Sequence, residues 1–394
     1  MDTQTGLDVL ASEEFRLLKG KTIGVVCHQA SVARDLEHIL DKLLPLHQAG
    51  ELKIAAVFGP QHGIWGHTQD NMIEWEGYVD VRTGLRFFSL YGEHREPTPS
   101  MLEGIDTLVV DVQDVGARYY TFIWTLANCM KACELLGIKV LVLDRPNPIT
   151  GTQFEGPGAD PEFKSFVGLH PLPVRHGMTI GEIALYLKDT HYPKSNLEIV
   201  AMKRWNPSFM YSQTGLNWAM PSPNMPSEET ATVYPGQCLL EGTKLSEGRG
   251  TTRPFEMFGA PYIDGWEFCD AMNGMNLPGA FFRPIQFLPT FQKYGGEVCQ
   301  GAYLHVTDRK DFHSVKTTVA LLHTIRRLYG EKFEWLSPPY EYEYDLMPID
   351  ILWGGTQLRE WVDAQVPVQQ IWDFIDESVK GLLAETGHFH IYQR

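Results

Sequence analysis

The sequence Thr22-Ile23-Gly24-Val25-Val26-Cys27, followed by His28-Gln29, contains the pattern that decides the fold: a short apolar run that ends in polar residues. Three later runs repeat it. They are residues 53–58 before Gly59-Pro60-Gln61-His62-Gly63, residues 106–110 before Asp111-Val112-Gln113-Asp114, and residues 139–143 before Asp144-Arg145-Pro146-Asn147. The intervening segments are long enough for helical crossovers, so we expect parallel strands of an open α/β sheet, buried on both faces.

The polar ends of these runs indicate a binding site. Open parallel sheets bind ligands beyond the carboxyl ends of their strands. Turn residues such as Asp, Asn, Gly and Pro also cap helices and close loops, so one polar group alone carries little information. Four groups that bring together Gln, His, Asp and Arg favour a small-molecule site at the strand ends.

Length and periodicity predict two domains. A chain of 394 residues exceeds what one hydrophobic core usually serves. The alternation of strands and helices stops between residues 150 and 168, so residues 1–160 are expected to form the α/β domain and residues 161–394 a smaller α+β domain. Helices are expected at 117–136, 180–188, 315–329 and 368–384, and short strands at 198–202 and 302–306.

Composition limits the partners and the compartment. The formal net charge of −16 repels phosphate backbones and anionic membranes, so we expect no nucleic-acid or membrane partner. No apolar run is long enough to span a bilayer and no signal-peptide pattern opens the chain, so a cytoplasmic protein is expected as given. Removal of a signal peptide would leave the same sequence, which keeps a periplasmic or secreted location open. The sequence gives no indication of oligomeric state.

Several cofactor and catalytic motifs are missing from the sequence. It contains no G-x-x-x-x-G-K-[ST] loop and no G-x-G-x-x-G turn after the first strand, so we expect no nucleotide cofactor. Neither H-E-x-x-H nor G-x-S-x-G occurs, and the six cysteines form no C-x-x-C pair, so we expect neither a metal site nor a serine hydrolase.

The remaining mixture of Asp, Glu, His, Tyr and Trp near glycine-rich turns is typical of carbohydrate sites. Cleavage of a glycosidic bond needs a protonated acid and, usually, a second carboxylate. Asp111 and Asp114 have a structural alternative, because they can hold Arg118 or cap the next helix. The candidate carboxylates are Glu74, Glu76, Glu93, Asp111, Asp114, Glu241 and Glu247.

Two loops in the second half are expected to contact a ligand. Residues 221–226 contain three prolines, which stiffen the backbone around Ser222 and Asn224. Residues 241–256 interleave arginines and carboxylates with Gly and Thr, a composition that permits close backbone approach and directional hydrogen bonds. A structural corner and a solvated charged loop are the alternatives.

With these motifs in view, the chain resembles the DUF1343 family, described as exo-acting β-N-acetylmuramidases of a glycoside hydrolase family. The resemblance implies a Rossmann-like first domain, a smaller second domain and an active-site cleft between them. It also implies release of terminal N-acetylmuramic acid from peptidoglycan fragments, a muropeptide or disaccharide, without a nucleotide or metal. It rests on Phe58–Gly63, Ser89-Leu90-Tyr91-Gly92, residues 111–118, Asp144-Arg145-Pro146-Asn147-Pro148, Arg175-His176-Gly177-Met178-Thr179 and the loops at 221–226 and 241–256.

One position departs from that family pattern. Members often have Gly-Pro-Glu-His-Gly where this chain has Gly59-Pro60-Gln61-His62-Gly63, and that Glu is the favoured catalytic carboxylate. An amide cannot exchange a proton in that role at neutral pH. Asp70 and Glu74 lie close by in sequence and are the expected substitutes, with assistance from His62.

The predicted site follows from these observations. An arginine, Arg249 or Arg253, is expected to meet the lactyl carboxylate of a muramic acid derivative. The rival interpretations are a carbohydrate-binding homologue that lost its acid at Gln61, and a hydrolase of a different amino sugar. The predicted catalytic residues are Glu74, His62, Gln61 and Asp114, and the predicted substrate-binding residues are Arg118, Tyr120, Asn224, Glu247, Arg249, Arg253 and Trp65.

Overall fold

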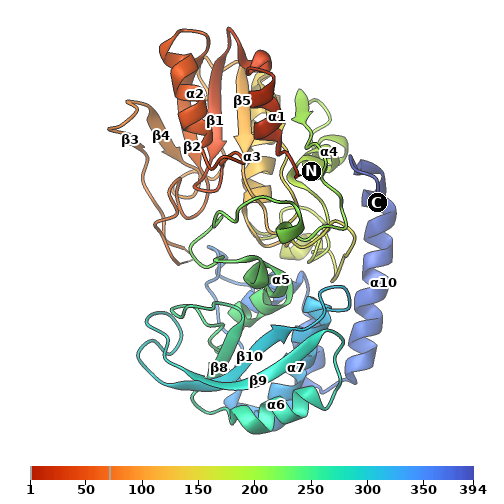
Figure 1. Cartoon of the computed structure of the whole chain (residues 1–394). Coiled ribbons are helices and arrows are strands. Elements are labelled where there is room, and N and C mark those ends of the chain that lie inside the picture. Colours follow the sequence, from red (N-terminus) through yellow and green to blue (C-terminus); the bar gives the residue numbers. More distant parts are fainter. Residues whose placement is uncertain (1, 71) are drawn as a thin grey trace.

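The computed structural model describes residues 2–70 and 72–394 and divides into two domains, one above the other in Figure 1. The first is built on a seven-stranded sheet with the order β3-β4-β2-β1-β5-β6-β7. All its neighbouring strands are parallel except β3 and β4. Its elements are α1 (Gly6–Ser12), β1 (Thr22–Cys27), α2 (Ile39–Gln48), β2 (Lys53–Gly59), β3 (Tyr78–Val79), β4 (Arg86–Ser89), β5 (Thr107–Asp111), α3 (Phe122–Leu136), β6 (Lys139–Leu143), α4 (Ile180–Thr190) and β7 (Leu197–Val200).

The four apolar runs form the centre of this sheet, as predicted. β1 lies between β2 and β5, where Val25 is in register with Val57 on one side and Val109 on the other. These strands are buried along almost their whole length, because helices cover both faces of the sheet. Their carboxyl ends all point toward the second domain (Figure 1), which brings the loops that follow them to the domain boundary.

The predicted boundary at residue 160 is too early. The strand expected at 198–202 in the second domain is β7, which pairs in parallel with β6 and so belongs to the first sheet. The helix before it, α4, starts with the expected capping box, in which the Thr179 and Glu182 side chains bond each other's backbone. The alternation of strand and helix resumes after a long irregular segment, which hid the last crossover from the sequence pattern.

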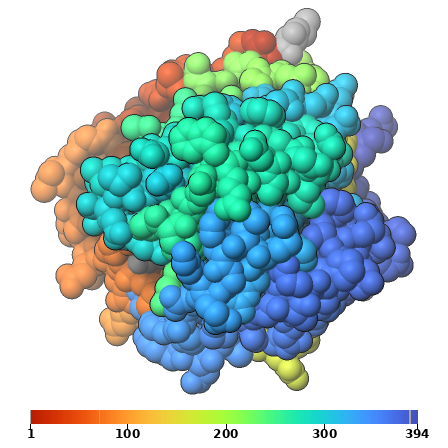
Figure 2. Space-filling view, turned by 90° about the horizontal axis from the view of Figure 1, so that it is seen from below, coloured from red at the N-terminus to blue at the C-terminus, as the bar shows by residue number. Residues whose placement is uncertain are grey.

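The second domain has a three-stranded antiparallel sheet, ordered β8-β10-β9, covered by helices. Seen from below in Figure 2, its green to blue surface covers much of the first domain, whose orange segment remains visible at one side. Its elements are α5 (Glu228–Gln237), β8 (Met257–Ala260), α6 (Gly265–Asn273), β9 (Ala280–Phe287), β10 (Cys299–Val306), α7 (Ser314–Tyr329), α8 (Pro348–Trp353), α9 (Gln357–Asp363) and α10 (Val368–Thr386).

The C-terminal end returns to the first domain. α10 runs up the side of the second domain, and the chain after it ends beside α4 (Figure 1). There Arg394 pairs with Glu182 at 2.7 Å, and Tyr392 donates to Asp144 at 2.6 Å. These contacts tie the end of the chain to α4 and to the residue that follows β6. Among the described residues, no helix is long and apolar enough to cross a membrane.

Arg118 connects the domains from inside. The helix expected at 117–136 begins only at Phe122, because residues 117–121 turn inward and Arg118 is fully buried. Its guanidinium donates to four backbone carbonyls, from residues 157 and 172 of the first domain and 352 and 353 of the second. Burial lowers the pKa of Arg118 to about 10, so the group stays charged at neutral pH. The predicted role of Arg118 in substrate binding would need an accessible side chain, whereas this one is fully buried and both its Nη atoms donate within the fold.

We expect Arg118→Met to lower the free energy of unfolding by on the order of 3 kcal/mol, because it leaves four buried carbonyls without their donor. Urea titration followed by circular dichroism measures this. Arg16→Met is the control: Arg16 is exposed and makes one 3.5 Å ion pair, so its loss should stay within about 0.5 kcal/mol. Equal effects of both variants would contradict the role of Arg118.

Candidate active site

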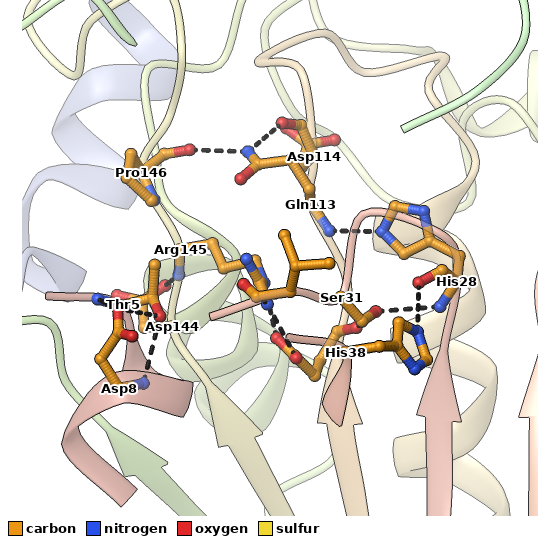
Figure 3. Close-up of polar contacts among 12 residues, drawn as sticks. Thr5, Asp8, His28, Ser31, His38, Gln113, Asp114, Asp144, Arg145 and Pro146 are labelled. Carbon is orange, nitrogen blue, oxygen red and sulfur yellow. Dashed lines mark hydrogen bonds and ion pairs between the residues drawn. The ribbon is translucent and has the colours of Figure 1, made fainter. Parts of the chain in front are cut away.

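Most of the polar residues that follow the strands bind one another. Arg145, after β6, pairs with Asp111 at the end of β5 through two bonds of 2.5 and 2.8 Å. His28, after β1, accepts from the backbone of Gln113 at 2.8 Å, and its other ring nitrogen contacts the Pro221 carbonyl at 3.1 Å. Figure 3 shows this network across the strand ends. Burial lowers the pKa of His28 to about 3, so a neutral imidazole links the two loops.

Asp114 and Asp144 are also engaged within the protein. Asp114 Oδ2 accepts a hydrogen bond from the backbone N–H of Gly116 and lies 3.1 Å from His176 Nε2. The Asp114 and His176 side chains are both buried. Asp144 accepts from Thr179 and from the backbone of α4. The polar groups that follow β1, β5 and β6, three of the four predicted groups, therefore connect loops to one another. Asp114 lies outside the candidate pocket described below.

A pocket between the domains is the candidate active site. The first domain contributes the turn after β2 and residues 119–122 at the start of α3. The loop at 221–226, the 241–256 segment and residues 340–341 close it from the other side. Its lining residues are Gln61, His62, Tyr119, Tyr120, Thr121, Phe122, Val167, Ser222, Asn224, Met225, Tyr234, Glu241, Arg249, Phe255, Tyr340 and Glu341.

Glu341 is the central acid of this pocket. Its Oε1 accepts from Gln61 Nε2 at 3.3 Å, and its Oε2 accepts from the Tyr91 hydroxyl at 2.7 Å. Thr121 donates to Gln61 Oε1 at 2.6 Å, which fixes the amide with its NH₂ group toward the acid. Glu341 itself has a left-handed backbone conformation, with φ +47°. An unusual backbone and two donors, one of them oriented by Thr121, thus hold one carboxyl group in place.

The environment of Glu341 favours its protonated form. Burial and the nearby charge of Glu241 raise the pKa of Glu341 to about 7, although Tyr91 and Gln61 oppose the shift. For Glu241 burial also acts to raise the pKa, but Arg249, Tyr340 and Lys293 together outweigh it and lower the pKa of Glu241. The pocket therefore contains one carboxyl that holds a proton near neutral pH and one that stays ionised, the division that acid-assisted bond cleavage requires.

Arg249 sits in a cluster of opposite charges. It pairs with Glu241 at 2.7 Å and lies 3.4 Å from Glu247, which also pairs with Lys293 at 2.8 Å. The Tyr340 hydroxyl donates to the other oxygen of Glu241 at 2.6 Å. Two cations thus face two carboxylates, and the cluster holds Glu241 in a single orientation.

Comparisons with known proteins agree with the two-domain architecture. Two family models match, described as the N-terminal and the C-terminal part of exo-β-N-acetylmuramidase NamZ, over residues 23–229 and 232–392. The chain belongs to the NamZ family. Peptidoglycan β-N-acetylmuramidase NamZ of Bacillus subtilis (strain 168) is 46% identical over 334 residues, which cover 85% of this chain and 80% of that protein.

Two solved structures share the whole fold, both DUF1343 family proteins from Bacteroides fragilis NCTC 9343. One aligns with a TM-score of 0.89 at 31% identity, and the other with 0.77 at 25% identity. Each alignment covers 100% of this chain and 99% of the other. The predicted family and the α/β plus α+β fold class are therefore confirmed.

The pocket of this NamZ family member contains part of the predicted site. Gln61, His62, Tyr120, Asn224 and Arg249 all line it. Burial lowers the pKa of His62 to about 4, and its Nδ1 lies 2.8 Å from the Thr68 carbonyl, so the ring is neutral and presents Nε2 as an acceptor. The stiff loop at 221–226 does bring Asn224 to the pocket, as its prolines predicted.

Other predicted residues lie outside the pocket. The Glu74 side chain is exposed beside Tyr342, whose pKa it raises together with burial. Trp65 is 42% exposed and packs against His38. The Arg253 side chain is exposed beside Glu256. The Glu247 side chain is buried, and its carboxylate contacts Arg249 and Lys293. Sequence proximity to Gln61 was a poor guide for Glu74 and Trp65, because both side chains lie outside the pocket, although Gln69 between them contacts Asn224 and Arg249.

Sequence reasoning missed Glu341 and its neighbours. The segment Pro338-Pro339-Tyr340-Glu341-Tyr342-Glu343-Tyr344 alternates aromatic and acidic residues after two prolines, a signal comparable to that of the 221–226 loop. It lies about 280 positions from Gln61, so nothing local connects the two. Within the described ranges, no group of three or more His, Cys, Asp or Glu residues is arranged to hold a metal ion.

We expect Glu341→Gln to change the pH dependence of stability. The raised pKa means that the stability contributed by protonated Glu341 is present below pH 4.5 and lost as the pH rises through 7. Relative to wild type, the variant should gain roughly 3 kcal/mol of unfolding free energy between pH 4 and pH 8. Urea titrations at both pH values measure the change. The exposed Glu74→Gln should show no such gain, and a pH-independent difference for Glu341→Gln would contradict the assignment.

Proposed function

We propose that this chain is an exo-acting β-N-acetylmuramidase that releases N-acetylmuramic acid from the non-reducing end of peptidoglycan fragments, with Glu341 as its general acid. The observation that carries the proposal is the buried Glu341 carboxyl in the interdomain pocket, held by Gln61 and Tyr91 and poised to carry a proton near neutral pH. Family membership and the activity in the name of the Bacillus subtilis relative support it.

Glu341 supplies what Gln61 cannot. A general acid must give a proton to the glycosidic oxygen as the bond to the anomeric carbon breaks, and the amide of Gln61 has no such proton. Gln61 instead positions the acid, because Thr121 orients its amide and its NH₂ faces Glu341 Oε1. This division of roles favours an enzyme over a binding protein that has lost its acid.

Glu241 and Arg249 complete the chemistry. The transition state of glycoside cleavage carries positive charge on the sugar ring, and an ionised carboxylate on the pocket wall stabilises that charge. Glu241 is held in this state by Arg249 and Tyr340. Among the described residues, the hydrogen bond of Arg249 Nη1 is a long, 3.5 Å contact with the Gln69 carbonyl, so this nitrogen is the proposed partner of the lactyl carboxylate.

Replacement of the acid tests the proposal. We expect Glu341→Gln to lower kcat/KM by about 10²–10⁴-fold. The loss should be larger on the disaccharide of N-acetylmuramic acid linked to N-acetylglucosamine than on a 4-nitrophenyl N-acetylmuraminide, because nitrophenolate leaves without a proton. In wild type, kcat/KM should fall above about pH 7 as Glu341 ionises.

Glu74→Gln is the matched control for this experiment, since Glu74 is exposed outside the pocket, and it should keep the wild-type rate. Full activity of Glu341→Gln would refute the assignment. Binding of N-acetylmuramic acid by calorimetry without any release from either substrate in wild type would favour the carbohydrate-binding alternative. Release of a different sugar from a glycoside panel would favour the other amino-sugar hydrolase.

Gln61→Glu tests the positioning role of Gln61 separately. A second carboxyl at this position would lie about 3.3 Å from Glu341, and two carboxyls so close share a proton, which raises one of the two pKa values further. We therefore expect the alkaline limb of the kcat/KM profile to move to higher pH than in wild type. An unchanged limb would show that residue 61 does not act on the acid.

A further inference from the structure

Arg95 is a cation near the acid whose charge the chemistry described above does not use. It belongs to the loop after β4, and its backbone carbonyl accepts a hydrogen bond from Asn128 of α3 at 3.1 Å. Its Nε and Nη2 atoms are buried, yet neither has a hydrogen-bond partner among the described residues. Burial of such a charge is costly unless other groups compensate for the lost water.

Three aromatic rings provide that compensation. The Arg95 guanidinium carbon lies 4.2 Å from the ring centre of Tyr342, 4.8 Å from that of Tyr91 and 5.2 Å from that of Phe166. The faces of aromatic rings carry negative partial charge and attract a cation. These three rings, which we call the aromatic cage, fix the guanidinium without neutralising it, so its positive charge remains available to an anion nearby.

Two rings of the aromatic cage are joined directly to the acid. The Tyr91 hydroxyl donates to Glu341 Oε2 at 2.7 Å, and Tyr342 follows Glu341 in the chain. Met72 connects the same two rings, because its N–H donates to the Tyr91 hydroxyl and its carbonyl accepts from the Tyr342 hydroxyl, each at 3.1 Å. Arg95, the cage and the acid therefore form one packed unit that spans both domains.

The charge of Arg95 acts on Glu341. Burial raises the pKa of Glu341 to about 7, and the positive charge of Arg95 opposes the rise because it favours the ionised carboxylate. The pKa of His62 is about 4 and that of Glu241 is lowered, so neither titrates with Glu341. The titratable and charged groups around the acid are Tyr91, Tyr340, Tyr342, Glu74, Glu241, His62, Arg95 and Arg249.

We propose that Arg95 is a positioning residue for the acid, which stabilises the carboxylate that Glu341 becomes when it gives up its proton. This rests on the proposed function, because it assumes that Glu341 is the general acid. The Glu341 proton moves to the glycosidic oxygen as the bond from this oxygen to the anomeric carbon breaks, and the leaving sugar keeps the proton as a hydroxyl. A cation already fixed in the aromatic cage stabilises the new carboxylate without any rearrangement.

Arg95→Met and Arg95→Lys together test the proposal. Methionine fills the aromatic cage without a charge, so we expect kcat/KM for the disaccharide at about pH 6 to fall about tenfold and the alkaline limb of its pH profile to move to higher pH. Activity on the 4-nitrophenyl substrate should change little, which also shows that the variant is folded. Lysine keeps a cation on the rings and should restore the limb and most of the rate.

Arg86→Met is the matched control, because Arg86 also lies over an aromatic ring, 5.0 Å from the centre of Phe88, but is exposed outside the pocket. It should behave like wild type on both substrates. An alkaline limb of Arg95→Met at the wild-type position, or equal effects of Arg95→Met and Arg95→Lys, would overturn the role of the Arg95 charge.

A double-mutant cycle separates this inference from the proposed function. Without the Glu341 carboxyl no carboxylate forms, so Arg95→Met should cause no further loss on the disaccharide in a Glu341→Gln background. The same tenfold loss in that background would show that Arg95 does not act through Glu341, and would overturn this inference alone. Full activity of Glu341→Gln itself would overturn the proposed function and this inference together.

Discussion

The burial of the Glu341 carboxyl against Gln61 is the constraint on which the site depends. Glu341 comes from the last sixth of the chain and Gln61 from the turn after β2, and their side chains meet at 3.3 Å between the domains. A carboxyl in such a place holds its proton more tightly than one in water, because burial and the charge of Glu241 outweigh the opposing effects of Tyr91, Gln61 and Arg95. Separation of the domains would return the Glu341 carboxyl to water and to its ordinary pKa. The raised pKa of Glu341 therefore depends on the contact between the domains.

The groups that hold the domains together lie away from the acid. Arg118 donates hydrogen bonds to backbone carbonyls of both domains, and Arg394, at the end of the chain, forms an ion pair with α4. The network of His28, Asp111 and Arg145 connects the strand ends in the same way. Most of the polar residues at the strand ends thus stabilise the frame, and the pocket is formed above them by loops from both domains.

The sequence pattern was most informative where structure is local. The four parallel strands, the capping box at Thr179 and the helices α7 and α10 follow from short-range periodicity and end signals. The loop at 221–226 was found because proline restricts the backbone independently of its surroundings. The boundary at residue 160 failed because a long irregular segment separates β6 from α4, and a helix with β7 after it completes the same sheet.

Predictions about the site also succeeded where they needed only local sequence and failed where they needed long-range contacts. Residue order alone showed that Gln61 cannot be the acid and predicted that the loops of Asn224 and Arg249 face a ligand, since these conclusions need only the chemistry of each side chain and its neighbours. The position of Glu341, the exposure of Glu74 and the burial of Arg118 required the folded chain. A carboxyl becomes an acid through what desolvates and contacts it, and those partners come from positions 61, 91 and 241, far away in sequence.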